Sequence, residues 1–222
     1  MILEQYLNTL SVQQHQQLMT ALNIQKVDFE TVVAAARQLY WVHLWPSKLS
    51  ITGDNGKKLL ENTNYTGLSL IDSVNARNPS LVLDVGCGQN FYKNKIKNLI
   101  GIDVFGNNCD LNYDYFVSDR RIIADVILVL GVLEYGSPDQ AHQRLVRILQ
   151  DCRPTTEVFF RFNISSTYRN EIMPGLDICY FMNKRVYSPS QWNHAVEQAG
   201  FRVIFSDWDT VDQRWHVRAT PA

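Results

Sequence analysis

The chain has 222 residues, of which 45% are hydrophobic and 19% charged, a composition that excludes a disordered protein and suits one α/β domain with an appended segment. Its formal net charge of -1 argues against a protein held mainly by nucleic-acid phosphates. No apolar run approaches the roughly 20 residues of a membrane span, and no C-x-x-C pair indicates a zinc site. We therefore expect a cytoplasmic protein with free thiols, no metal and no membrane partner.

Residues 1–78 form the first predicted unit, an N-terminal helical segment. Its clearest helix spans 29–45, where apolar residues recur at helical spacing. Asp28 can cap this helix, and Pro46 ends it. A short helix over 68–76 is expected to close the segment. The helical spacing predicts packing against the rest of the chain.

The second predicted unit, 79–222, begins with a strand that is buried on both faces. The apolar run over 81–85 carries one acid, Asp84, and leads into Gly86 and Gly88. Glycines at such a turn let the backbone take left-handed dihedrals and approach a ligand closely. The amides of the next turn can face polar or anionic groups. These features favour a nucleotide-like ligand.

A second acid follows at the end of the next apolar run, 99–103. Asp103 lies nineteen positions after Asp84, about the span after which nucleotide-binding folds place an acid on the ribose hydroxyls. The glycine turn after Asp84 and the acid Asp103 together resemble the class I S-adenosylmethionine-dependent methyltransferases. The first motif of that family is D-x-G-x-G-x-G, and its second strand ends in an acid. Asn90 stands at the third glycine position and tolerates positive φ.

The connections after these two strands are short for that family. The stretch 91–97 has room for two helical turns, and 103–125 must contain any second helix and a third strand, which is expected near 111–117. We therefore predict a shortened first helix and a shortened region of the second helix and third strand. The resemblance implies a polar adenine contact after that strand, a role for which three side chains compete: Asp110, Asn112 and Asp114.

The apolar run over 124–130 predicts another buried strand. The resemblance places the backbone of Leu130 and Gly131 beside the methionine end of the cofactor. Glu134 is the ionisable side chain at this strand exit, where open α/β sheets bind ligands, and it is the candidate general base. A structural role is the alternative for Glu134 and for the three further candidates, Tyr135, Tyr168 and His194.

Two helix starts with capping residues follow, Ser137 to Gln140 and Ser188 to Gln191. Between the two helices we expect a strand over 157–163. The next stretch, 164–187, is polar and aromatic and longer than an ordinary connection, so it is a candidate substrate loop.

The last two predicted strands, 201–205 and 214–219, are joined by a short loop without a helix and must be antiparallel. Methyltransferase sheets end in such a hairpin, whereas the ordinary dinucleotide fold does not. We therefore predict an α/β fold, a Rossmann-like methyltransferase sheet that is mostly parallel with a C-terminal antiparallel hairpin, preceded by the N-terminal helical segment.

The resemblance implies S-adenosyl-L-methionine as the cofactor and methyl transfer as the reaction. The residues it assigns to the cofactor are Asp84, Gly86, Cys87, Gly88, Asn90, Asp103, Val104, Asp110, Leu130 and Gly131. The near-neutral charge favours a small-molecule acceptor, as do the aromatic residues that could cover the site: Tyr40, Trp41, His43 and Trp45. Nucleic acid and protein acceptors stay open, as does the oligomeric state. The alternative functions are a non-catalytic methyltransferase-like module in an assembly and a nicotinamide-dependent oxidoreductase.

Overall fold

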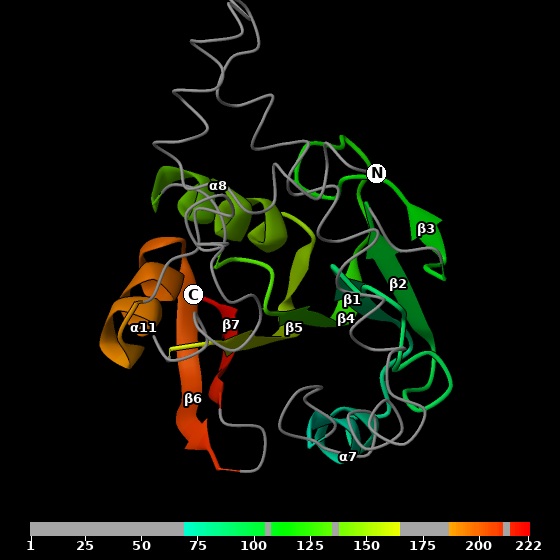
Figure 1. Ribbon diagram of the computed structural model, residues 1–222, viewed down its shortest axis with the longest axis horizontal. Helices are drawn as coiled ribbons and strands as arrows, with labels where there is room; N and C mark the ends of the chain where they lie inside the picture. The colour runs from blue at the N-terminus through cyan, green and yellow to red at the C-terminus, as the bar shows by residue number, and fades with distance from the viewer. Residues whose placement is uncertain (1–68, 105–107, 135–137, 165–186, 211–213) are drawn as a thin grey trace, which may run out of the picture.

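The computed structural model describes residues 69–104, 108–134, 138–164, 187–210 and 214–222. Within these residues the chain forms one seven-stranded sheet and three helices (Figure 1). The predictions for most of the N-terminal segment, for the cap at Ser137 and for the substrate loop lie outside the described residues. No helix in the described part is long and apolar enough to cross a membrane.

The sheet has the strand order β3-β2-β1-β4-β5-β7-β6. Its strands are β1 Val82–Val85, β2 Leu99–Asp103, β3 Leu111–Asn112, β4 Ala124–Leu130, β5 Cys152–Phe162, β6 Phe201–Asp209 and β7 Arg214–Pro221. Strands β1 to β5 pair in parallel, while β7 runs antiparallel to both of its neighbours. The predicted fold class, a mostly parallel sheet with a C-terminal antiparallel hairpin, is confirmed.

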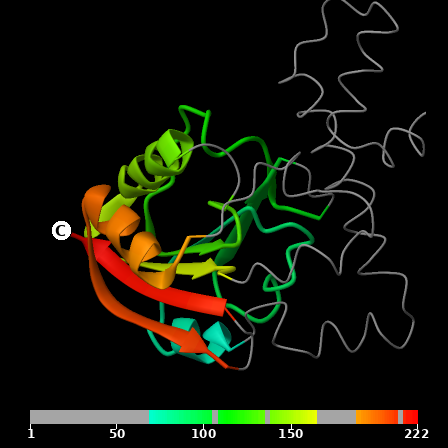
Figure 2. The same ribbon diagram turned by 60° about the vertical axis from the view of Figure 1, so that its left-hand side comes forward.

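Helices cover both faces of the sheet. Figure 2 shows α8 (Pro138–Leu149) and α11 (Pro189–Gln198) on one face and α7 (Leu70–Asn75) on the other. The predicted cap of α11 is present: the Ser188 side chain accepts a hydrogen bond from the Gln191 amide, and the Gln191 side chain accepts one from the Ser188 amide. Together these bonds satisfy two amide donors that the first helical turn leaves unpaired.

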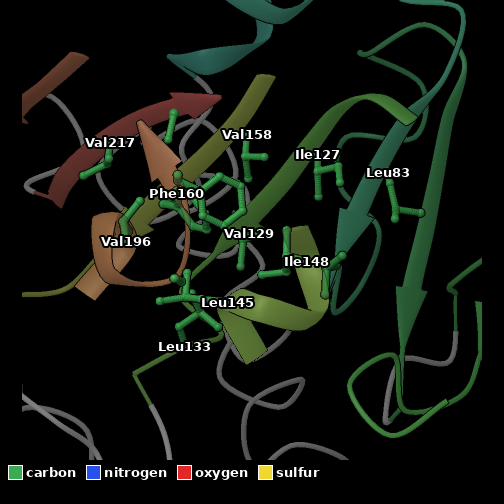
Figure 3. Close-up of a cluster of buried hydrophobic side chains, with 14 of the residues drawn as sticks. Leu83, Ile127, Val129, Leu133, Leu145, Ile148, Val158, Phe160, Val196 and Val217 are labelled. Atoms are coloured by element: carbon green, nitrogen blue, oxygen red, sulfur yellow. The ribbon is translucent and has the colours of Figure 1, made fainter. Parts of the chain in front are cut away.

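The larger hydrophobic core lies between the sheet and the helices α8 and α11 (Figure 3). Inward-facing aliphatic residues of β1 and β4 fill its centre, and aromatic residues fill the side near α11. Phe162 stacks on Trp192 with ring centroids 4.0 Å apart, and Phe160 packs edge-on against Phe201 at 5.7 Å. Full burial of one such ring contributes about 1.5–3 kcal/mol.

The smaller core lies under α7. Leu70 and Val74 of this helix pack with buried side chains of β1, β4 and β5, including Phe159. Directly after the helix, the Arg77 guanidinium pairs with Glu157 and lies over the Phe159 ring. The short helix predicted over 68–76 is thus confirmed for its central residues and covers the middle of the sheet.

The shortening predicted for the first half of the domain is confirmed, with two differences in detail. Residues 91–97 form consecutive turns instead of the two helical turns for which the spacing has room, because Asn90 and Asn98 adopt left-handed φ of 58° and 56° at the two ends. Strand β3 ends at Asn112 and does not extend to 117. The chain leaves the sheet because Tyr115 turns into the core, where its hydroxyl donates to Asp151 Oδ2 at 2.9 Å.

Candidate functional site

The glycine turn after β1 folds over the end of β2. Strands β1 and β2 are parallel neighbours, so Asp84 and Asp103 lie near adjacent strand exits, as the sequence predicts. The Gly86 amide donates to Ile102 O at 2.8 Å, and the Gly88 amide donates to Asp103 Oδ2 at 2.9 Å. The order of the sheet reverses between β1 and β4, which is where open α/β sheets bind ligands.

The two glycines have different roles in this turn. Both have positive φ, +73° at Gly86 and +57° at Gly88. A Cβ at Gly86 would lie 2.4 Å from Val132 Cγ2, so this residue must be glycine for the turn to pack against the β4 exit. A Cβ at Gly88 would meet nothing within 4 Å. The Gly88 backbone therefore has space beside Asp103 in which a ligand can approach it.

Asp84 is a buried acid at the end of β1, with 2% of its surface exposed. Its Oδ2 atom is buried without a hydrogen-bond partner among the described residues. Burial raises the pKa of Asp84 to about 7; the nearby Arg161 charge opposes this rise, and Asp103 adds to it. A cationic ligand group beside Asp84 would favour the ionised carboxylate.

Gly131, directly after β4, lies across the switch point from the glycine turn. Its φ is +77°, and its amide donates to Arg161 O at 3.0 Å. A Cβ on Gly131 would lie 4.0 Å from Arg161 Nη2, so the guanidinium reaches the β4 exit next to Leu130. Arg161 was not predicted as a site residue, although it is the one charged residue within the apolar run 158–162. That interruption of a buried strand is the signal that could have identified it.

Asp110 joins the β2–β3 connection to the glycine turn. Its Oδ2 accepts from the Gly101 amide at 2.8 Å and from Asn90 Nδ2 at 3.2 Å, and Lys93 Nζ lies 2.7 Å from Oδ1. Although desolvation acts in the opposite direction, these donors hold the pKa of Asp110 below its usual value. The side chains of Asp110 and Asn90 thus bind the protein itself, and their roles toward a cofactor stay predictions.

The two competitors of Asp110 for the adenine contact make local hydrogen bonds. Asn112 Nδ2 donates to Asp103 O at 3.1 Å, so this side chain lies beside the acid at the end of β2. Asp114 Oδ1 accepts from the Phe116 amide at 2.9 Å within its own turn. Asn112 is therefore the competitor that the structure brings next to Asp103.

Two further residues assigned to the cofactor, Cys87 in the glycine turn and Val104 after β2, differ in exposure. Cys87 is buried and points at β2, with its sulfur 2.8 Å from the Cβ position of Gly101, and burial raises the pKa of its thiol. Only its backbone can therefore face a ligand. Val104 directly follows Asp103 and is 45% exposed.

Glu134 lies after β4 and forms a hydrogen bond with the backbone just after β5. It is 3% exposed, and its Oε1 accepts a hydrogen bond from the backbone amide of Asn163, just after β5. This places the carboxylate at the carboxyl edge of the sheet and gives it a structural role there. Tyr135 and Tyr168 lie outside the described residues. His194 is exposed on α11, which packs on the face opposite α7, so the structure does not bring it to the glycine turn.

Comparison with known proteins gives likeness in fold only. No family model matches the sequence, and no curated protein matches it. Among solved structures, 1,6-didemethyltoxoflavin-N1-methyltransferase of Burkholderia thailandensis, with S-adenosylhomocysteine bound, has a TM-score of 0.58 and 15% identity, covering 85% of this chain and 88% of its own. The N-methyltransferase NodS of Bradyrhizobium japonicum, also with S-adenosylhomocysteine, has a TM-score of 0.56 and 14% identity, covering 80% and 97%.

A third structure, mitomycin 7-O-methyltransferase, has a TM-score of 0.58 and 17% identity over 75% of this chain. The match spans only 55% of that enzyme, a little more than half of its length. At such identities the likeness establishes the arrangement of strands and helices, and the chemistry must be argued from the residues of this chain.

Proposed function

We propose that this chain, which has the fold of the class I S-adenosylmethionine-dependent methyltransferases, binds S-adenosyl-L-methionine and transfers its methyl group to a small-molecule acceptor. The observation that carries the proposal is the hydrogen bond from the Gly88 amide to Asp103 Oδ2 at 2.9 Å. It joins the open glycine turn after β1 to the acid at the end of β2, beside the switch point of the sheet.

The residues at this edge fit an adenosyl sulfonium with an amino acid head. Asp103 lies where a carboxylate can accept hydrogen bonds from ribose hydroxyls. Gly88 leaves the space for the ligand, since nothing lies within 4 Å of its Cβ position. Asp84 presents a buried oxygen that an ammonium could satisfy. Both S-adenosylhomocysteine complexes among the similar structures support this cofactor.

The sulfonium cofactor supplies a methyl group on a leaving group that is already activated. The protein therefore needs to align the acceptor with that methyl group and exclude water, which can supply most of the catalysis. A general base is required only where the acceptor must lose a proton early. Glu134 is the ionisable side chain that we assign to this role, because it lies at the β4 exit.

The acceptor is proposed to be a small molecule. Mitomycin 7-O-methyltransferase and 1,6-didemethyltoxoflavin-N1-methyltransferase are named for small molecules, which supports this class. The near-neutral net charge of the chain supports it too, since a protein that binds nucleic acid through phosphates carries a basic surface.

The direct test is calorimetric titration of the intact protein with S-adenosylhomocysteine. We expect binding by the wild type and a loss of about tenfold or more in Asp103→Ala, because a charge-assisted bond to the ribose is removed. Asp139→Ala is the matched control, since Asp139 is an exposed acid in the first turn of α8. The absence of heat with the wild type, or equal affinities of wild type and Asp103→Ala, would remove the proposal.

The same preparations separate the two alternatives. Enhanced NADH fluorescence on mixing would favour the oxidoreductase, although the C-terminal hairpin argues against a second mononucleotide half. Failure of every nucleotide ligand, together with a stable partner in a pull-down, would favour the non-catalytic module. The shortened connections around β3 are the feature that motivates that alternative.

A further inference from the structure

Two side chains of opposite charge lie on the same face of the sheet, near the exits of β1 and β5. Asp84 is paired in register with Leu128 of β4, and Arg161 is paired with Leu130. Leu128 and Leu130 are two residues apart on one strand, so all four side chains point to the face that α7 covers. Strand β4 is the only strand between the acid and the base.

The strands that carry Asp84 and Arg161 are two strand spacings apart, roughly 10 Å. The Arg161 side chain spans much of this distance. The guanidinium extends across β4 and toward its end, where Nη2 lies 4.0 Å from the Cβ position of Gly131. Arg161 is also the group whose positive charge acts on Asp84, against the effect of burial on the Asp84 pKa. The Arg161 guanidinium thus acts electrostatically on the Asp84 carboxyl at the switch point.

A ligand with an α-amino acid head carries an ammonium and a carboxylate on a single carbon atom. An acid and a basic fork a short distance apart complement such a head, because the acid faces the ammonium and the fork faces the carboxylate. Asp84 supplies a carboxylate oxygen without a hydrogen-bond partner among the described residues, and arginine supplies a planar fork that matches a carboxylate. The Gly131 backbone lies between them and has no side chain to block the approach.

We infer that Arg161 binds the carboxylate of the amino acid head of the cofactor, while Asp84 faces its ammonium. This inference rests on the proposed function and assigns a binding residue to it. Arg161 then selects S-adenosylmethionine and S-adenosylhomocysteine over adenosyl ligands without a carboxylate. If the arginine served only to stabilise Asp84 and the fold, it would make no distinction between these ligands.

The test measures three ligands by calorimetry with the intact protein. They are S-adenosylhomocysteine, its decarboxylated analogue, which keeps the ammonium, and 5′-methylthioadenosine, which lacks the whole head group. The wild type is expected to bind S-adenosylhomocysteine about 10- to 100-fold more tightly than the decarboxylated analogue, because one charge-assisted fork is lost. Arg161→Met is expected to abolish that preference and to leave the affinity for 5′-methylthioadenosine unchanged.

Arg218→Met is the matched control. Arg218 is paired with Phe159 of β5 on the same face of the sheet, but its guanidinium lies near Glu157 and over the Phe205 ring, away from the exit of β4. It should keep the wild-type preference. Arg161→Lys, which retains the charge without the fork, should keep part of the preference and serves as the variant to measure if Arg161→Met does not fold.

The outcomes separate the two proposals. Equal losses for all three ligands in Arg161→Met, or an unchanged preference in both Arg161 variants, would overturn the assignment of Arg161 while the proposed cofactor stands. The assignment also fails if the wild type binds 5′-methylthioadenosine and shows no preference between the other two ligands. If the wild type binds none of the three, the proposed function itself is wrong and the assignment goes with it.

Discussion

The two halves of the sheet are stabilised by different interactions. The half that contains β1, β2 and β3 is held around the glycine turn by hydrogen bonds between polar groups, with Asp110 and Asp103 as acceptors. The half that contains β5, β6 and β7 is held by stacked aromatic rings, with Phe162 on Trp192 at its centre. The first half has no helix between its described strands, while α11 packs against β6 and β7 in the second half.

This difference means that stability and ligand binding depend mainly on different halves of the sheet. Aromatic burial is non-directional and stabilises the fold without fixing a polar geometry. The hydrogen bonds around the glycine turn fix the positions of backbone amides, and they leave space at Gly88 and an unsatisfied oxygen at Asp84. Substitutions in the aromatic half should therefore change unfolding alone, whereas those in the glycine half should also change ligand binding or the pH dependence of stability.

The largest effect is expected from Trp192→Ala. Trp192 is fully buried and stacks on Phe162, so the substitution leaves a large cavity and should lower the free energy of unfolding by about 3–5 kcal/mol. Urea denaturation followed by circular dichroism measures this loss. Trp208→Ala is the control, because Trp208 on the edge strand is 36% exposed and should cost about 1 kcal/mol. Similar losses in the two variants would contradict the role given to the aromatic core.

A pH dependence is expected from Asp84. Its pKa rises from the ordinary 3.8 to about 7 on folding, so the folded protein holds a proton that the unfolded chain has lost between these values. That contribution to stability is complete below about pH 3.8 and is lost as the pH rises through about 7. Asp84→Asn should therefore gain stability relative to the wild type over this range, by on the order of 4 kcal/mol.

Urea denaturation of both proteins at several pH values tests the Asp84 prediction. Asp139→Asn, a substitution at an exposed acid, should show no such gain. A constant difference between Asp84→Asn and the wild type from acid to neutral pH would show that the buried acid does not titrate there.

The two glycines of the turn should respond differently to alanine. Gly86→Ala forces a Cβ to 2.4 Å from Val132 Cγ2 at a positive φ, which should destabilise the protein by about 2–4 kcal/mol. Gly88→Ala has space for its Cβ and should cost about 1 kcal/mol, yet it should weaken S-adenosylhomocysteine binding because the methyl group enters the ligand space. Thermal unfolding and calorimetry measure the two effects, and Gly88→Ala with wild-type affinity would place the ligand elsewhere.

The smallest effect is expected at the start of α11. Ser188→Ala removes the side chain that caps the Gln191 amide and should lower the free energy of unfolding by about 1 kcal/mol. Ser190→Ala, two positions later, removes an exposed hydroxyl contact with Ser188 Oγ but keeps the Ser188–Gln191 capping pair, and should stay within about 0.5 kcal/mol of the wild type. A chemical denaturation series with both variants provides the measurement. Binding of S-adenosylhomocysteine should be the same in both.

Much of the fold could be predicted from local sequence patterns. The buried strands β1, β2 and β4 are short apolar runs, and the cap of α11 is visible in Ser188 and Gln191. The hairpin of β6 and β7 follows from a connection too short for a crossover. Asn90 takes the left-handed φ expected at the third glycine position. Each of these features depends on residues close together in the chain.

Other features depend on which distant segments meet, and only the tertiary structure decided them. The end of β3 at Asn112 depends on Tyr115, whose hydroxyl donates to Asp151 in the core. Only one strand, β4, separates the strands of Asp84 and Arg161, so the charge of Arg161 acts on Asp84. The ends of β4 and β5 lie side by side, so Glu134 accepts a hydrogen bond from the Asn163 amide. Local patterns indicate which segments form strands and turns, whereas strand order and register fix which side chains come together across the sheet.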